Sequence, residues 1–384
     1  MMWRIAASLT RELDRTFKLY LAFLLTKLWR KARAIAGERC WLLSGMSGQI
    51  YADNSAALHR YLVENRPDLN VYWVIDRDSP DVDKARQVGP VLYRGDLSTY
   101  VYGLLARVHV ISHGLADVPT CGSALSKGAV KVRLGHGLTA LKKTKGSPLR
   151  SVGAKNRVFD LVPVASEFER QNKLTWGIDP RKLVVTGLPR FDDLVRKSEL
   201  NHSPDGTNAS PSRILYMPTW RDWLPGSTGR FVETDFYKQV AGFLLHPALH
   251  KALIRHNVFL YVHFHVILHH HLALIGREIA DLSHVNVLSP DQDLQDAIVR
   301  SSLLITDYSS VAWDFLYLDK PVLFYQFDVE KFNEYRGASI DLNDLFGPIA
   351  RDAGSAVDLT RRFVESDFDY TDSKSDMERW QRKA

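Results

Sequence analysis

Short apolar runs that alternate with helical patterns restrict the fold of this sequence more than any other feature. In residues 303–325, LLITDYSSVAWDFLYLDKPVLFY, an apolar run stops at a polar turn, a helical pattern follows, and a second apolar run begins after Lys320-Pro321. Strands buried on both faces read as continuous apolar runs, and strands that alternate with helices form parallel sheets. The sequence therefore predicts an α/β fold with doubly wound parallel sheets. We expect strands at 71–75, 108–112, 130–134, 161–165, 183–186, 213–217, 258–263, 285–288, 303–306 and 322–325.

The length and one turn-rich stretch divide the chain. A chain of 384 residues is long for one hydrophobic core, so we expect two domains. Residues 201–212, NHSPDGTNASPS, consist almost entirely of turn-forming residues and predict a linker. We expect an N-terminal domain at 35–200 and a C-terminal domain at 213–384, with a cleft between them. In the first domain, a helix should begin at ADNS, residues 52–55, with Asp53 or Asn54 as its cap.

Residues 1–34 form a third region with the pattern of a basic amphipathic helix. Residues 1–33 contain eight Lys and Arg against Glu12 and Asp14, which accounts for the formal net charge of +6 of the whole chain. No distributed basic face remains, so we expect no nucleic-acid partner. The apolar stretch 19–25 is shorter than the ~20 residues of a membrane span, and basic residues stand where a signal peptide would be cleaved. We expect this helix to lie on an anionic membrane surface; the alternative is a helix packed on the protein body.

Several kinds of chemistry find no support in the sequence. Cys40 and Cys121 are too few for a disulfide framework and are not spaced for a metal site. No dinucleotide-binding glycine string, P-loop or serine elbow is present, so nicotinamide, ATP and acyl-ester chemistry are not indicated. The histidine-rich stretch 262–272, VHFHVILHHHL, permits a metal reading, but a single histidine that contacts phosphate is favoured over it. We expect neither a cofactor nor a metal.

Distinctive polar strings follow four of the predicted strands. In doubly wound sheets, ligands bind beyond the carboxyl ends of the strands, where loops lead into helices. A binding site is therefore expected where these loops meet. The strings are Gly135-His136-Gly137, Gly187-Leu188-Pro189-Arg190, Pro218-Thr219-Trp220-Arg221-Asp222 and Asp307 to Ser310.

Each string has a functional interpretation and a structural alternative. The glycines beside His136 leave its ring unobstructed, which suits a general base, and the alternative is a turn histidine bonded to backbone. Asp307, Ser309 and Ser310 precede a helix whose free N–H groups favour phosphate, although helix capping would explain one serine. Arg221 could bridge phosphate oxygens or belong to a surface loop with Asp222.

Taken together, these strings resemble the CDP-glycerol glycerophosphotransferase family, the primases and polymerases of wall teichoic acid and related capsule polymers. The shared order of the strings, over about residues 40–350, is more specific than any one of them. The matching strings are YADNSAALHRYL (51–62), NVYWVID (70–76), GHGLTALKK (135–143), TGLPRFDDL (186–194), YMPTWRD (216–222), ITDYSSVAWDFLYLDKPVLFYQFD (305–328) and EYRG (334–337).

The resemblance implies transfer of a polyol phosphate by a GT-B-like pair of Rossmann-like domains. The N-terminal domain at 35–200 would bind the acceptor, and the C-terminal domain at 213–384 would hold most of the CDP-glycerol donor. His136 would take a proton from the acceptor hydroxyl, whose oxygen attacks the β-phosphorus of CDP-glycerol while CMP leaves. His265 would be the second functional histidine. The implied acceptor is a lipid-linked glycan on the cytoplasmic face of a bacterial membrane. The remaining implied substrate-binding residues are Gly135, Gly137, Pro218, Thr219, Arg221, Asp222, Asp307, Ser309, Ser310 and Arg336.

Two departures from the family pattern stand out. The family usually has threonine and then proline after His-Gly, where this chain has Leu138-Thr139, and it usually has proline after the second histidine, where this chain has Val266. The second departure leaves open whether His263 or His265 is the functional histidine. A GT-B glycosyltransferase that uses a sugar nucleotide, and an inactive membrane-bound scaffold, are the alternative functions. The sequence leaves open primase or polymerase, glycerol or ribitol, the acceptor's identity and the oligomeric state.

Overall fold

The computed structural model describes most of the chain, in two compact units. The first unit comprises Met1–Leu138 and Ser147–Asp192, and the second Thr139–Gly146 and Asp193–Ala384. The division falls inside helix α8 (Pro189–Asn201), before the predicted linker at 201–212. The described residues are 2–28, 39–135, 137, 138, 141, 143, 158–201, 211–221, 223, 224, 228–264, 276–289 and 292–384.

The first unit contains a parallel sheet in the strand order β3-β2-β1-β4-β5. All neighbouring strands in it are parallel. A parallel pair, β6 and β7, continues beside β5 through a bridge between Val132 and Leu161. The strand bounds are β1 Cys40–Ser44, β2 Asn70–Ile75, β3 Val91–Tyr93, β4 Val108–Ile111, β5 Val130–Arg133, β6 Val162–Val164 and β7 Leu183–Val185.

Side chains of successive strand residues enter the cores on opposite faces of this sheet. Leu42 of β1 packs in one core and Leu43 in the other, as the period of two along a strand requires. The helices α3 (Asp53–Asn65) and α4 (Val82–Val88) contribute to the core that contains Leu43. On the other face, α5 (Leu97–Leu105) and α7 (Glu167–Leu174) pack against the core that contains Leu42. Short 3-10 turns lie at Met46–Gly48, Ala124–Ser126 and Pro180–Lys182.

The second unit contains a six-stranded sheet in the order β10-β9-β8-β11-β12-β13. Every neighbouring pair is again parallel. The chain order runs outward from β8 on one side and from β11 on the other, which is the strand order of a Rossmann fold. The bounds are β8 Arg213–Met217, β9 Phe259–Val262, β10 Val285–Val287, β11 Leu303–Thr306, β12 Val322–Tyr325 and β13 Ile349–Ala350.

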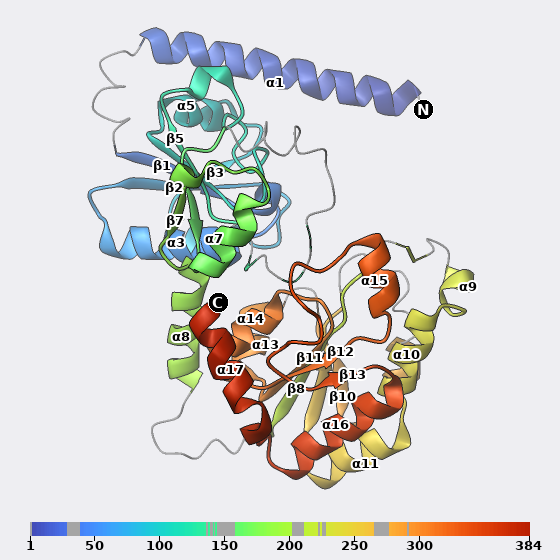
Figure 1. Ribbon diagram of the computed structural model, residues 1–384. Coiled ribbons are helices and arrows are strands. Elements are labelled where there is room, and N and C mark those ends of the chain that lie inside the picture. Colours follow the sequence, from blue (N-terminus) through green and yellow to red (C-terminus); the bar gives the residue numbers. More distant parts are fainter. Residues whose placement is uncertain are drawn as a thin grey trace. The chain divides into compact units, whose positions relative to one another are not determined.

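Helices cover both faces of the second sheet (Figure 1). On one face, α10 (Asp235–Leu244), α11 (Pro247–Arg255) and α16 (Ala353–Glu365) enclose a large apolar core. On the other face lie α13 (Leu294–Arg300), α14 (Val311–Tyr317) and α17 (Thr371–Lys383). There the rings of Trp313 and Trp380 approach within 5.6 Å between centroids. The short helices α9 (Thr228–Phe231) and α15 (Val329–Tyr335) complete the unit.

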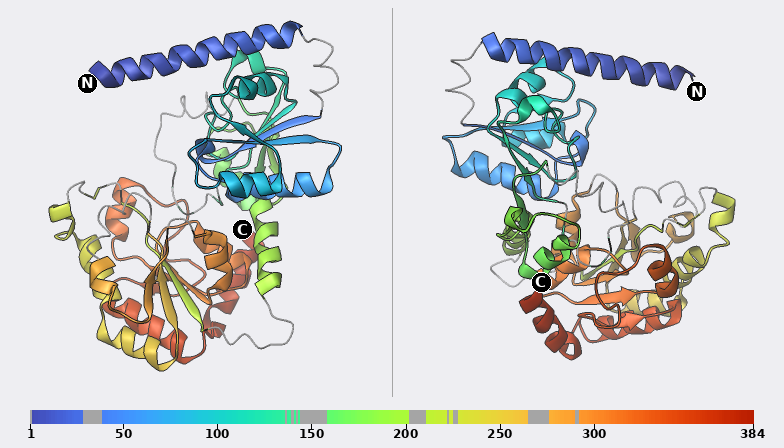
Figure 2. Two further views of the ribbon diagram at one scale, coloured as in Figure 1. Left: turned by 180° about the vertical axis from the view of Figure 1, so that it is seen from behind. Right: turned by 45° about the horizontal axis from the view of Figure 1, so that its top comes forward.

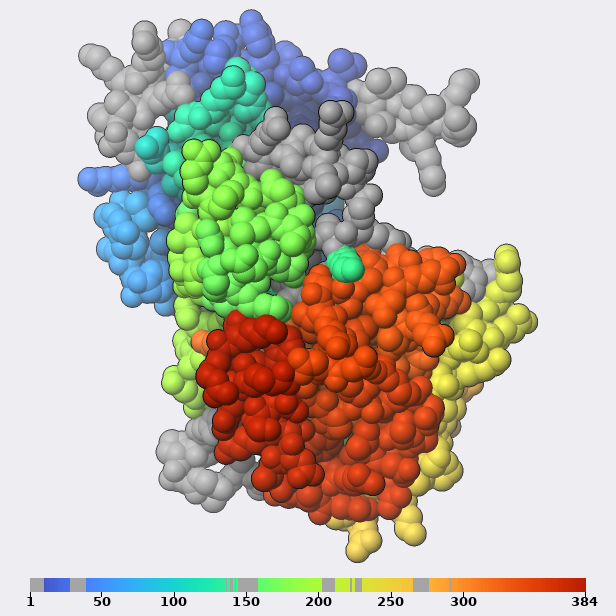
Figure 3. All heavy atoms as spheres, in the orientation of Figure 1, coloured from blue at the N-terminus to red at the C-terminus, as the bar shows by residue number. Residues whose placement is uncertain are grey.

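Helix α1 (Met2–Leu28) lies along α5 on the first unit (Figures 1 and 2). Ala22 is fully buried there and packs with Tyr100 and Leu104. The described helices include none with the length and apolar content that crossing a membrane requires. Much of α1 is open to view on the surface in Figure 3.

All ten predicted strands are confirmed, with ends that differ by at most one residue. The prediction did not include β1, β3 and β13, and β1 is the central strand of the first sheet. The predicted cap of α3 is wrong, because Ala52 occupies the N-cap position and no side chain caps this helix. Asn54 instead makes two long-range hydrogen bonds that belong to the candidate site.

Candidate functional site

Two of the predicted strings meet at the centre of the second sheet. Strands β8 and β11 are neighbours, and Met217 is paired with Thr306 at their carboxyl ends. The loops that follow begin with Pro218 and Asp307, and they diverge because the chain order reverses between these two strands. Such a switch point is where doubly wound sheets bind ligands.

A buried arginine joins the loops after β8, β11 and β12. We call Thr219, Arg221, Asp307 and Asp328 the arginine network. Arg221 Nη1 lies 2.8 Å from Asp307 Oδ2, and Nε and Nη2 donate to the two oxygens of Asp328 at 2.7 and 3.0 Å. Arg221 Nη1 also donates to the carbonyl oxygen and hydroxyl of Thr219, at 2.8 and 2.6 Å. The backbone N–H of Thr219 donates to Asp307, 3.1 Å from Oδ2.

The centre of the arginine network is shielded from water, whereas Thr219 and Asp328 are only partly buried. Arg221 is 1% exposed and Asp307 2%. Burial alone would lower the pKa of the Arg221 guanidinium, but the nearby carboxylates of Asp307 and Asp328 outweigh it and raise the pKa above its ordinary value. Burial also raises the pKa of Tyr308, whose hydroxyl donates to Asp328 at 3.2 Å. The arginine therefore stays charged and its geometry is fixed on several sides.

These contacts change the interpretation of Arg221 and Asp307. The sequence predicts direct contacts with phosphate, but both side chains are already used by each other and by their neighbours. They hold the two loops together, whereas Thr219 is only partly buried. Because the Thr219 oxygen accepts from Arg221, its hydroxyl proton can be donated elsewhere. Pro218, before it, is buried.

The two serines after β11 have different environments. The Ser309 hydroxyl accepts from the N–H of Val311, at 3.4 Å, in the first turn of α14. Ser310 occupies the N-cap position, is exposed, and makes no side-chain cap hydrogen bond. Ser309 is thus the serine that bonds the helix end, and Ser310 presents its hydroxyl to solvent.

Two residues of this region were missed as functional candidates. Asp328 lies in the quoted string FYQFD but is separated from Arg221 by 107 positions, so no local pattern connects them. Gln326 donates to the carbonyl oxygen of Asp307 at 3.0 Å and accepts from Arg351 at 3.2 Å. It is fully buried and ties the loop after β12 to the loop after β11.

In the first unit, Asn54 connects two other predicted strings. Its side-chain amide donates to the carbonyl oxygen of Gly135 and accepts from the backbone N–H of Arg190, both at 3.1 Å. Asn54 is fully buried, at the start of α3. We call this pair of hydrogen bonds the Asn54 bridge. It holds Gly135, the first residue of the string that contains His136, to the string GLPR.

The backbone around the Asn54 bridge adopts conformations that few side chains tolerate. Gly135 and Gly137 have φ values of 76° and 87°, in the left-handed region that favours glycine. Asp53 also has a positive φ, 64°, and its carboxylate lies 3.2 Å from Arg190 Nη1. These contacts give the loop a defined path immediately before His136.

Leu141 and Lys143, farther along the string GHGLTALKK, belong to the second unit. The N–H of Lys143 donates to the carbonyl oxygen of Gly337 at 3.0 Å, and the N–H of Ser339 donates to Leu141 at 3.1 Å. Arg336, the arginine of EYRG, caps the carboxyl end of α15 through its backbone N–H, which donates to Phe332. The strings GHGLTALKK and EYRG are therefore linked by backbone hydrogen bonds.

Three predicted site residues lie outside the described residues. These are His136, Asp222 and His265, and their roles stay predictions. His263 is described, and its backbone N–H donates to the carbonyl oxygen of Tyr216 at 2.9 Å.

Comparisons with known proteins point to one family. The profile described as "CDP-Glycerol:Poly(glycerophosphate) glycerophosphotransferase" matches residues 30–380. A teichoic acid glycerol-phosphate transferase of Staphylococcus aureus is 24% identical, over 85% of each chain. A teichoic acid glycerol-phosphate primase of Bacillus subtilis is 27% identical over 58% of this chain and 54% of its own length.

Solved structures agree in fold. A structure of the wall teichoic acid polymerase TagF covers 98% of this chain and 93% of that chain, with a TM-score of 0.71 and 19% identity. TagF has also been solved after a soak with CDPG. The predicted α/β fold class is thereby confirmed.

Proposed function

Since the chain belongs to the CDP-glycerol:poly(glycerophosphate) glycerophosphotransferase family, we propose that it transfers glycerol phosphate, or a related polyol phosphate, from CDP-glycerol to a hydroxyl of a lipid-linked acceptor. The observation that best supports this proposal is the meeting of two family strings, PTWR and TDYSS, at the switch point of the second sheet. A switch point suits a nucleotide diphosphate because loop hydroxyls and free N–H groups converge there.

The proposed reaction is an in-line displacement at phosphorus. His136 takes the proton of the acceptor hydroxyl, and the oxygen forms a bond with the β-phosphorus of CDP-glycerol. The bond from that phosphorus to the bridging oxygen breaks, and CMP leaves with the oxygen and its electron pair. Such reactions depend mainly on positioning and charge stabilisation, which fixed loops and hydroxyls supply. His265 is the proposed second histidine, in contact with phosphate.

The arginine network is proposed to act on the donor indirectly. Asp307 and Asp328 hold Arg221, and Arg221 fixes the Thr219 hydroxyl so that its proton is directed at a phosphate oxygen. The exposed Ser310 hydroxyl makes a second contact. In this scheme Arg221 is a positioning residue.

A donor assay on the full chain tests the function. Purified protein is incubated with a lipid-linked acceptor and one donor at a time. The donors are CDP-glycerol, CDP-ribitol and a UDP-sugar, and the products are sized by mass spectrometry. We expect CMP release and acceptors heavier by polyol phosphate units. Turnover of UDP-sugars alone would instead support a glycosyltransferase. His136→Ala should lower transfer by about 10²–10⁴-fold, as loss of a general base does, and leave nucleotide binding intact.

We also propose that α1 places the enzyme on the cytoplasmic face of the membrane. Four large apolar side chains at helical spacing stand out from the protein: Leu13 is 70% exposed, Phe17 65%, Tyr20 60% and Leu24 39%. The opposite side of the helix, with Ala22, packs on α5. A helix with one face packed on the protein and a second, apolar face in water suits a membrane surface.

Vesicle sedimentation tests this placement. Phe17→Glu should reduce binding to anionic vesicles at least tenfold, because it puts a charge into the apolar face. Tyr61→Glu, at a residue 59% exposed on α3, is the matched control and should bind as the unmodified protein does. Equal binding of Phe17→Glu and the control would exclude α1 as the membrane contact.

A further inference from the structure

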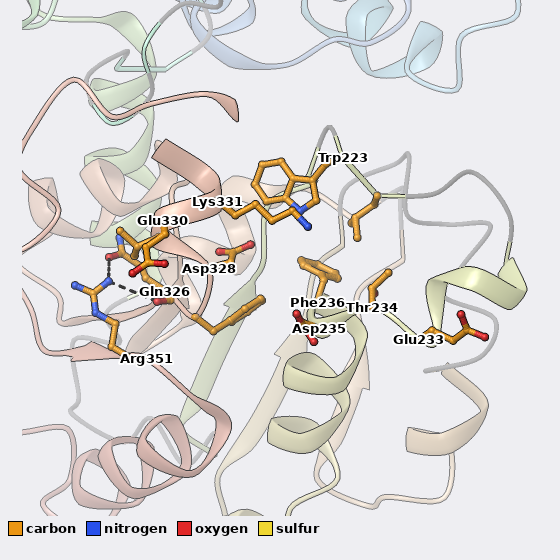
Figure 4. Close-up of a pocket in the computed structure, with 13 residues that line it drawn as sticks. Trp223, Glu233, Thr234, Asp235, Phe236, Gln326, Asp328, Glu330, Lys331 and Arg351 are labelled. Carbon is orange, nitrogen blue, oxygen red and sulfur yellow. Dashed lines mark hydrogen bonds between the residues drawn. The ribbon is translucent and has the colours of Figure 1, made fainter. Parts of the chain in front are cut away.

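A cavity of about 750 Å³ opens at the carboxyl edge of the second sheet (Figure 4). Its walls come from the loop after β8, the start of α10 and the loop between β12 and α15. Asp328 of the arginine network forms part of the wall, so the cavity adjoins the loops proposed to hold the donor. The volume lies within the range of about 300–1,000 Å³ that ligand pockets occupy.

The charges around this cavity oppose an anionic ligand. Among its described lining residues, four are acidic and two, Lys331 and Arg351, are basic. The guanidinium of Arg351 donates to the side-chain oxygens of Gln326 and Asn343, at 3.2 and 2.8 Å. Three of the carboxylates are exposed and have no hydrogen-bond or ion-pair partner among the residues that the structure describes, whereas the fourth, Asp328, pairs with Arg221. The three are Glu233, Asp235 and Glu330.

An aromatic side chain provides an apolar wall. The ring centroids of Trp223 and Tyr335 lie 5.0 Å apart. Lys331 Nζ lies 5.7 Å from the centroid of the Trp223 indole. Phe236 and Phe327 also line the cavity. An indole held in this way offers a flat surface to the C–H face of a sugar ring, while carboxylates accept hydrogen bonds from sugar hydroxyls.

We propose that this cavity binds the neutral glycan of the acceptor. This inference rests on the proposed function and gives the class of acceptor that it uses. A phosphate in this position would meet the unpaired carboxylates of Glu233, Asp235 and Glu330, so a chain of glycerol phosphate units is disfavoured. The glycerol end of the donor shares the polyol chemistry but is small for the volume. The enzyme therefore adds its unit to a sugar hydroxyl, as a primase does, rather than extending a phosphate polymer.

Two synthetic acceptors that differ by one group test the inference. The first is a neutral disaccharide on a short alkyl chain, and the second is the same molecule with one glycerol phosphate attached. CMP release from CDP-glycerol by the full chain gives kcat and KM for each. We expect kcat/KM to be at least tenfold higher for the neutral acceptor. If neither acceptor causes CMP release, the proposed function fails; if both are used equally, or the charged one better, only this inference fails.

Three variants locate the effect. Trp223→Ala should raise the KM for the neutral acceptor at least fivefold, with kcat and the KM for CDP-glycerol little changed. Joint replacement Glu233→Lys and Asp235→Lys should shift the preference toward the charged acceptor at least fivefold. Asp358→Lys, at an exposed residue of α16, makes the same kind of charge change away from the cavity and should leave the preference unchanged. If Trp223→Ala leaves the KM for the neutral acceptor unchanged, the assignment of the cavity is wrong. If it raises the KM for CDP-glycerol instead, the cavity holds the glycerol of the donor, and the assignment is wrong as well.

Discussion

The arginine network and the Asn54 bridge perform similar tasks with different chemistry. Each joins loops at the carboxyl ends of parallel strands, and each is centred on a buried side chain, Arg221 or Asn54. The arginine network does so with a charged guanidinium between two carboxylates. The Asn54 bridge uses one neutral amide, which donates to Gly135 and accepts from Arg190.

The difference indicates what each region must provide. Buried charges are costly to leave unpaired, so the arginine network holds its loops in one arrangement or loses much stability. A neutral amide imposes a smaller penalty and mainly sets the position of two backbone groups. We infer that the second unit maintains a rigid frame for a charged donor, whereas the first unit positions the backbone of the loop that carries His136.

Removal of one charge from the arginine network should have the largest effect. Asp328→Ala leaves Arg221 Nε and Nη2 without their acceptors in a place that is 1% exposed. We expect a loss of about 3–5 kcal/mol in the free energy of unfolding, measured by urea denaturation and circular dichroism. Asp344→Ala, which breaks the exposed pair with Arg379, is the control and should cost about 0–1 kcal/mol.

A triple variant separates stability from function in the same network. Arg221→Met with Asp307→Asn and Asp328→Asn removes the guanidinium together with both carboxylates. No buried N–H group of Arg221 then lacks its acceptor, so the free energy of unfolding should exceed that of Asp328→Ala. Transfer activity should stay low because Thr219 loses the guanidinium that orients it. If Asp328→Ala costs no more than Asp344→Ala, the contrast between the two regions is wrong.

Acid should weaken the first unit more than the second. Burial lowers the pKa of His59, on α3, to about 4, and that of His109, on β4, to about 4. Between pH 6.5 and 4 the unfolded chain binds protons at these residues that the folded chain does not, so stability falls as the pH decreases. The loss is at most about 3 kcal/mol for each histidine. In the second unit, burial also lowers the pKa of His250, which is only partly buried.

Thermal unfolding followed between pH 7 and 4 measures this loss. His59→Gln keeps a hydrogen-bonding partner for Tyr51, 2.9 Å from His59 Nδ1, but cannot be protonated. The fall in stability between pH 6.5 and 4 should shrink by about half. An unchanged pH profile in His59→Gln would show that this histidine does not govern the acid sensitivity.

The sheets were predictable because their signals are local. Apolar runs of four to six residues between turn formers identified ten strands, including all the inner strands of the second sheet. Strand β1 was not identified, although it is the central strand of the first sheet. Its central position comes from pairing with Asn70 in β2 and Val108 in β4, which are distant in sequence. Nothing in the run CWLLS itself indicates these partners.

The site was predictable in location but not in its contacts. The rule that ligands bind at strand ends selected the loops that contain Thr219 and Asp307. Whether Arg221 faces a ligand or a carboxylate depends on Asp328, which only the folded chain brings within 2.7 Å. Asn54 looked like a helix cap because its neighbours fit that pattern, whereas its partner Gly135 is 81 positions away.

The smallest expected effect comes from the Asn54 bridge. Asn54→Ala removes the hydrogen-bond partner of the Gly135 carbonyl and of the Arg190 N–H. We expect the free energy of unfolding to fall by about 1–3 kcal/mol. Because these groups position the loop before His136, we expect kcat to fall about tenfold, with the KM for CDP-glycerol unchanged. Asn54→Asp, which can accept from Arg190 but cannot donate to Gly135, should not restore kcat. Asn65→Ala, at the exposed end of the same helix, is the matched control. A change in KM without a change in kcat would assign Asn54 to substrate binding and remove the proposed difference between the two regions.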